Sequence, residues 1–140
     1  MRPEPPTAGT GVGKGGLSDP IRVLLVDDDP AVRGSLKFAF ELEGFEVTDF
    51  ASAELVAGEA NEANCLVLDY RLPGMNGLQL LALLRSRGSN APAIIITSHP
   101  NRKIREQIAE VHATLIEKPL LCDALTGTIR ALAEQRGLSA

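Results

Sequence analysis

One short stretch constrains the fold more than any other part of the sequence: residues 65–69, Cys-Leu-Val-Leu-Asp. Four apolar residues run without a break into one carboxylate, Asp69, and a turn-like segment rich in Pro, Gly and Asn follows. Such a short apolar run is typical of a strand buried on both faces, as in a parallel sheet covered by helices. Ligands of such sheets bind outside the carboxyl ends of the strands. Asp69 therefore stands where a binding site is expected.

The rest of the chain alternates strand-like and helix-like segments. Apolar runs predict strands at residues 21–26, 65–69, 93–97 and 113–116, and an alternating pattern predicts a less buried edge strand at 45–50. Helical spacing or capping residues predict helices around Val32, Leu36 and Phe40, over 53–61, around Leu78, Leu81 and Leu84, from near Pro100 through Ile104 and Ile108, and around Leu121, Leu125, Ile129 and Leu132. Five strands alternating with five helices imply right-handed βαβ crossovers. We therefore predict an α/β fold, a flavodoxin-like doubly wound five-stranded parallel sheet with strand order 2-1-3-4-5.

Length and composition indicate one small domain. The 140 residues suffice for a single hydrophobic core, and we expect a folded domain over residues 20–137. The preceding residues 1–19 contain five Gly and three Pro without a hydrophobic period, which predicts a disordered tail. The net charge of −4 argues against a nucleic-acid-binding domain, and no apolar run is long enough to span a membrane. The two cysteines lack metal-ligand spacing, which fits a reducing cytoplasm.

Three carboxylates should meet at one edge of the predicted sheet. Asp27 and Asp28 end the first strand and Asp69 ends the third, and these two strands are neighbours in the predicted order. Mutual repulsion should raise at least one carboxyl pKa, and Mg²⁺, which prefers oxygen ligands, would relieve it. An Asp after a strand more often caps a helix, which is the role that we assign to Asp29.

A hydroxyl and an ammonium group end the fourth and fifth strands. Thr97 would donate a hydrogen bond to a phosphoryl oxygen, and Lys118 would neutralise its charge. Asp69 is the lone carboxylate at its strand end and is the best candidate nucleophile, while Asp27 and Asp28 would hold the metal. Each residue type has ordinary structural uses, but their joint occurrence at four strand ends favours a phosphoryl site.

The same residues resemble the motifs of response-regulator receiver domains. The matching segments are residues 26–30 (Val-Asp-Asp-Asp-Pro), 68–77 (Leu-Asp-Tyr-Arg-Leu-Pro-Gly-Met-Asn-Gly), 95–98 and 117–119, and the resemblance covers residues 21 to about 136. It implies phosphorylation of Asp69 by a histidine kinase with Mg²⁺. It also implies metal ligation by Asp28, Asp69 and the backbone carbonyl of Arg71, with Asp27 nearby through water. Thr97 would be the switch hydroxyl and Lys118 the partner of the phosphoryl group.

Two features depart from the family pattern. Leu115 stands three residues before the lysine, where many receivers carry a Tyr or Phe that responds to phosphorylation. The segment between Thr97 and Lys118 is also about one residue shorter than the resemblance implies, and His99-Pro100 follows the Thr-Ser pair. We therefore expect a weak conformational response.

The resemblance implies a signalling protein rather than an enzyme. We expect a stand-alone receiver, because no DNA-binding or enzymatic output segment follows up to Ala140. Its partners would be a histidine kinase or phosphotransfer protein and an unidentified downstream protein, without nucleic acid or membrane. A phosphate sink or relay without an output partner is an alternative. A haloacid-dehalogenase-type phosphatase is another, since Asp27 and Asp29 have its D-x-D spacing, but it leaves Asp69 unexplained. The oligomeric state stays open.

Overall fold

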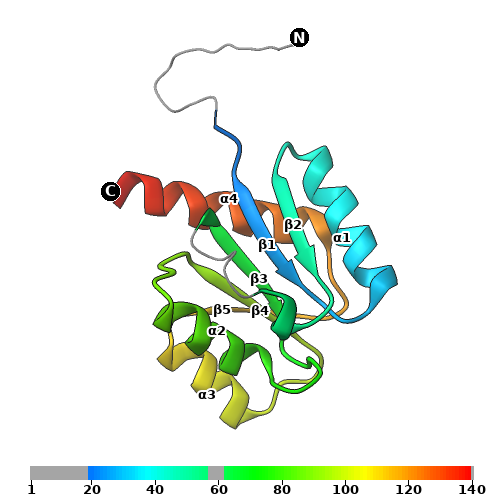
Figure 1. Cartoon of the computed structure of the whole chain (residues 1–140), viewed down its shortest axis with the longest axis vertical. Helices are drawn as coiled ribbons and strands as arrows, with labels where there is room; N and C mark the ends of the chain where they lie inside the picture. The colour runs from blue at the N-terminus through cyan, green and yellow to red at the C-terminus, as the bar shows by residue number, and fades with distance from the viewer. Residues whose placement is uncertain (1–18, 57–61, 140) are drawn as a thin grey trace.

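The computed structural model describes residues 19–56 and 62–139. Strands and helices alternate along the chain (Figure 1). Their bounds are β1 Arg22–Val26, α1 Pro30–Leu42, β2 Glu46–Phe50, the 3-10 helix η1 Ala53–Val56, β3 Cys65–Asp69, α2 Gly77–Ser86, β4 Ala93–Thr97, α3 Arg102–Glu110, β5 Thr114–Glu117 and α4 Cys122–Ser139. The predicted tail falls almost entirely outside the described residues.

The five strands form one parallel sheet in the order β2-β1-β3-β4-β5. This confirms the predicted flavodoxin-like fold and its strand order. All five residues of β3 and of β4 are buried, as expected for the interior strands of a sheet covered on both faces. β2 lies at one edge and is less buried, which agrees with its alternating sequence.

Successive side chains of the strands point to opposite faces of the sheet and form two separate hydrophobic cores. Val23 and Leu25 of β1 pack with Leu36 and Phe40 of α1, in a cluster that also includes residues of α4. The intervening residues, including Leu24, pack on the opposite face with residues of α2 and α3. Figure 1 shows α1 and α4 on one side of the sheet and α2 and α3 on the other. The alternation of the strand side chains therefore holds helices against both faces.

The helix prediction is wrong in its count. The described residues contain four α-helices, and the described part of the helix expected over 53–61 is a 3-10 turn, Ala53–Val56. Residues 57–61 lie outside the described part of the chain. Ala53 and Val56 are both buried, so this turn closes over the α2 side of the sheet with only two apolar residues.

Smaller differences concern where elements begin and end. Asn101 caps α3 by accepting a hydrogen bond from the Ile104 N–H at 2.8 Å, so this helix begins at Arg102 rather than near Pro100. β5 is shifted one residue from the predicted 113–116. Leu121 precedes α4 and is exposed instead of facing the core. No helix in residues 19–56 and 62–139 is long and apolar enough to cross a membrane.

Candidate functional site

The acidic residues meet at the carboxyl ends of two neighbouring strands. β1 and β3 pair in register, with Val26 beside Leu68, so the residues that follow them come together. Asp27, Asp28 and Asp69 each place a carboxylate oxygen within 4.8 Å of the others. Asp27 and Asp69 are buried and Asp28 is exposed. The predicted carboxylate cluster is therefore present, with one member open to solvent.

Lys118 and Thr97 lie at the same edge. The Lys118 ammonium nitrogen lies 3.6 Å from Oδ1 of Asp69. The Lys118 N–H donates to the carbonyl of Thr97 at 3.0 Å, which ties the ends of β5 and β4 together. The buried Thr97 hydroxyl donates to the Ser98 carbonyl at 3.3 Å. Both side chains line one cleft with Asp28, Asp69 and Arg71.

The electrostatics of the cluster favour a bound cation. Burial, followed by the nearby charge of Asp27, raises the pKa of Asp69 to about 6, although Lys118 and a hydrogen bond from the Arg71 backbone lower it. Burial also raises the pKa of Asp27, against the hydrogen bond from the Asp29 N–H. One lysine therefore does not fully compensate the buried carboxylates, and a further positive charge would stabilise them.

The donor set fits Mg²⁺. Three carboxylate oxygens cluster at the ends of β1 and β3, two of them from residues that line the cleft, and Asp28 is exposed, so ligand waters can reach the site. Mg²⁺ prefers oxygen ligands and keeps several waters. Arg71 also lines this cleft, where its backbone pairs with Asn76 in an isolated bridge.

The loop after β3 passes very close to the backbone of Asp69. Gly77 donates its N–H to the Tyr70 carbonyl at 2.8 Å and begins α2. A Cβ atom on Gly77 would lie 2.6 Å from the carbonyl oxygen of Asp69. Only glycine allows this close approach between the start of α2 and the backbone of the nucleophile candidate.

Asp29 has the structural role predicted for it. Its Oδ1 accepts hydrogen bonds from the N–H groups of Ala31 at 2.9 Å and Val32 at 3.3 Å, at the start of α1. The carboxylate is thereby used as a helix cap. The residues that follow β1 thus divide between the acidic cluster and the cap.

Sequence reasoning missed Arg33. Its Nη1 donates to the backbone carbonyl of Asp27 at 2.8 Å, and its Nε donates to Oδ2 of Asp49 in β2 at 3.1 Å. The apolar residues of α1 predict the helix but say nothing of its polar side chains, and Arg33 lies one turn after the capping Asp29. The position of Arg33, one turn after the cap of a helix that directly follows the acidic residues, is the sequence signal that could have identified it.

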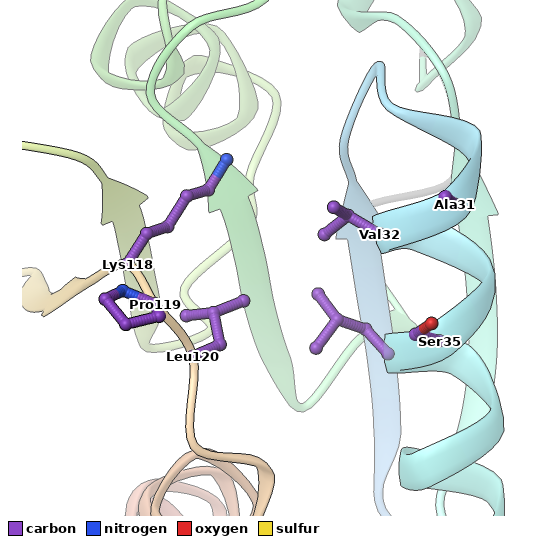
Figure 2. Close-up of a pocket in the computed structure, with 7 residues that line it drawn as sticks. Ala31, Val32, Ser35, Lys118, Pro119 and Leu120 are labelled. Atoms are coloured by element: carbon purple, nitrogen blue, oxygen red, sulfur yellow. The ribbon is translucent and has the colours of Figure 1, made fainter.

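An apolar groove adjoins the site. It runs between α1 and the segment that follows β5 and is lined by Ala31, Val32, Ser35, Leu36, Lys118, Pro119 and Leu120. Figure 2 shows Val32 and Leu120 pointing into it from opposite sides, while Lys118 extends toward the end of the neighbouring strand. The groove therefore places an apolar surface next to the lysine that contacts Asp69.

Comparison with known protein families identifies a match over most of the chain. The model of the response regulator receiver domain matches residues 23–130. The transcriptional regulatory protein FixJ of Azorhizobium caulinodans is 36% identical over 118 residues, which are 82% of this chain and 56% of that protein. The C4-dicarboxylate transport transcriptional regulatory protein DctD of Rhizobium meliloti is 36% identical over 119 residues, 83% of this chain and 26% of that protein. The chain thus spans about half or less of the length of these relatives.

Solved structures agree with this match. A CheY-like response regulator receiver domain protein from Methanospirillum hungatei superposes with a TM-score of 0.80 at 26% identity, covering 87% of this chain and all of that one. Full-length FixJ from B. japonicum superposes with a TM-score of 0.73 at 32% identity, over 81% of this chain and 58% of that one.

Proposed function

Because the chain belongs to the response regulator receiver family, we propose that it accepts a phosphoryl group on Asp69 from a histidine kinase or phosphotransfer protein. The observation that carries this proposal is the contact at 3.6 Å between the Lys118 ammonium and the buried Asp69 carboxylate, beside two further aspartates. A buried carboxylate with a cation beside it and an open cleft in front can attack an electrophile without rearrangement of the core.

The chemistry follows from the positions of these side chains. A carboxylate oxygen of Asp69 would form a bond to phosphorus, while the bond from phosphorus to the donor's histidine nitrogen breaks and its electron pair stays on that nitrogen. Lys118 would attract the equatorial oxygens of the transferred group, and the Thr97 hydroxyl would turn from the Ser98 carbonyl toward one of them. Charge stabilisation by fixed groups is the main contribution that a protein makes to this reaction.

Mg²⁺ is part of the proposal. Asp28, Asp69 and the backbone carbonyl of Arg71 would hold it directly, with Asp27 acting through water. When bound, the ion would neutralise phosphoryl oxygens and the charge of the clustered carboxylates. Because Asp28 is exposed, water molecules could reach the ion from its side of the site. The buried Asp27 carboxylate would be held in place by its hydrogen bond from the Asp29 N–H.

The groove beside α1 offers a surface for the phosphoryl donor. Its apolar lining by Val32, Leu36 and Leu120 would receive the apolar face of a donor helix, and Lys118 marks the end of the groove nearest the acceptor. Figure 2 shows that α1 forms one side of this surface and residues 118–120 form the other. The downstream partner would be a protein, as yet unidentified, that distinguishes the two phosphorylation states.

Intact mass measurement after incubation with acetyl phosphate and Mg²⁺ tests the acceptor. The wild-type protein should gain one phosphoryl group and the Asp69→Asn variant none. Lys118→Ala should phosphorylate more slowly, because the oxygens lose their fixed cation, whereas Thr97→Ala should still accept the group but transmit it poorly. A phosphorylated Asp69→Asn variant would move the nucleophile elsewhere, and equal loss in the Lys118 and Thr97 variants would refute their separate roles.

Two alternatives predict different outcomes. A phosphate sink would lose the phosphoryl group rapidly and show no partner that prefers the phosphorylated form. A phosphatase built on the D-x-D spacing would need Asp29 as a free second carboxylate, but this side chain caps α1. Turnover of a phosphate ester by the Asp69→Asn variant would support the phosphatase against the receiver.

A further inference from the structure

The carbonyl oxygen of Asp27 is held by a side chain from the adjacent helix. Arg33 donates from Nη1 to this oxygen at 2.8 Å, and its side chain is only 20% exposed. On the other side of the same residue, the Asp27 N–H donates to the Phe50 carbonyl at the end of β2 at 3.1 Å. The backbone of Asp27 is therefore fixed from two directions, by α1 and by β2.

Arg33 is itself fixed by an acidic residue of β2. Its Nε donates to Oδ2 of Asp49 at 3.1 Å, while the other oxygen of Asp49 lies 3.4 Å from the Lys37 ammonium one turn further along α1. The planar guanidinium thus joins a backbone carbonyl and a carboxylate through two of its nitrogens. A lysine could reach only one of these acceptors at a time, because its ammonium is a single point of contact.

The held carbonyl restricts the position of the next residue. The peptide between Asp27 and Asp28 is planar, so fixing the Asp27 oxygen fixes the N–H and the Cα of Asp28 as well. Asp28 is exposed, and its carboxylate depends on this backbone for its direction.

We infer that Arg33 is a positioning residue of the cation site: it orients the Asp27–Asp28 peptide so that Asp28 meets Mg²⁺ together with Asp69. The inference rests on the proposed function, since it concerns the same site. Residues that orient metal ligands from outside typically change the metal affinity by roughly 10–100-fold when replaced. Arg33 would therefore set the Mg²⁺ requirement of phosphorylation without touching the phosphoryl group.

The test compares Arg33→Lys and Arg33→Gln with Lys37→Gln. Lys37 contacts Asp49 from the same helix but makes no hydrogen bond to the Asp27 carbonyl, so it controls for loss of charge beside Asp49. Mg²⁺ affinity is measured in the unphosphorylated protein from the rise of the melting temperature with Mg²⁺ concentration. The rate of phosphorylation by acetyl phosphate is then measured over the same range of Mg²⁺ concentrations. This second measurement gives the half-saturating Mg²⁺ concentration and the maximal rate as two separate values.

Both Arg33 variants should need roughly tenfold more Mg²⁺ for half-saturation in both measurements, with a maximal rate within about twofold of wild type. Lys37→Gln should keep the wild-type Mg²⁺ requirement. Folded Arg33 variants with an unchanged requirement, or an equal increase in Lys37→Gln, would overturn the inference while leaving the proposed function intact. Should Arg33→Gln fail to fold, Arg33→Lys decides alone, because it retains the charge and the aliphatic stem. A wild-type protein that responds to Mg²⁺ in neither measurement would overturn the metal site itself.

Discussion

At the scale of single residues, the buried carboxylates make the metal-free protein less stable near neutral pH than at acidic pH. Asp69 has a pKa of about 6 in the folded chain against an ordinary value of 3.8, first because it is buried and then because Asp27 lies beside it. The folded state therefore binds the proton more tightly than the unfolded state does. The resulting stabilisation is complete below about pH 4 and is lost as the pH rises through about 6.

The free energy of unfolding of metal-free protein should consequently rise by about 1 kcal/mol between pH 7 and pH 5 through Asp69. Urea unfolding in the presence of a chelator measures this change. The Asp69→Asn variant should lack that part of the pH dependence and should be more stable than wild type at pH 7. Identical pH profiles for the two proteins would mean that Asp69 titrates normally.

At the scale of elements, the turn between β3 and α2 depends on the absence of a side chain. A Cβ atom on Gly77 would lie 2.6 Å from the Asp69 carbonyl oxygen and 3.2 Å from its carbon, and both are backbone atoms that cannot move aside freely. Gly77→Ala should destabilise the protein by about 1–3 kcal/mol, the usual cost of overpacking, and slow phosphorylation by displacing Asp69.

Gly127, inside α4, provides the control for Gly77. A Cβ atom on Gly127 would meet nothing within 4 Å beyond the backbone of its own helix, so Gly127→Ala should stabilise the helix by up to about 1 kcal/mol. Denaturant melts of both variants measure the difference. Equal effects of the two substitutions would show that helix propensity, rather than the approach to Asp69, decides the result.

The contact between β5 and α3 predicts a weak response to phosphorylation. Leu115 is already partly buried against the core cluster that contains Ile108 of α3. It therefore gains little apolar area if the loop after β4 moves, and each buried methylene contributes only about 0.8 kcal/mol. Such a small energy difference cannot drive a nearly complete switch.

Backbone amide chemical shifts with and without beryllofluoride would measure this response. The largest changes should fall at residues 97–104 and 113–120, with the two states both populated. We expect the output surface to consist of α3, β5 and α4, and changes confined to the surroundings of Asp69 would refute it. A complete shift that reaches all of α4 would show that leucine switches as well as an aromatic residue.

At the scale of the whole molecule, Mg²⁺ should stabilise the fold, because its binding joins the ends of β1 and β3. A ligand at about 100 times its dissociation constant adds roughly 2.7 kcal/mol to the free energy of unfolding. Thermal melts with and without millimolar Mg²⁺ measure the shift. Asp28→Ala should show a smaller shift than wild type, and an equal one would exclude Asp28 as a ligand.

The sheet and the set of residues at its edge could be predicted from the order of amino acids alone. An uninterrupted apolar run such as Cys65–Leu68, followed by turn residues, indicates a buried parallel strand, since such a strand needs apolar side chains on both faces. Strand order then brings Asp27, Asp28 and Asp69 together, and the structure places Lys118 and Thr97 at the same cleft. The roles of these residues in phosphoryl transfer remain predictions.

Contacts that depend on distance and direction emerge only in the folded chain. Residues Ala53–Val56 form a 3-10 turn where an α-helix was predicted, because local spacing does not reveal how much core surface is available to cover. The approach of Gly77 to Asp69 is equally invisible in the order of residues. The hydrogen bond from Arg33 to the Asp27 carbonyl joins a side chain to a backbone atom, and a backbone atom has the same chemistry at every position in the sequence. This hydrogen bond depends on the packing of α1 against β1 and β2, which requires the tertiary structure.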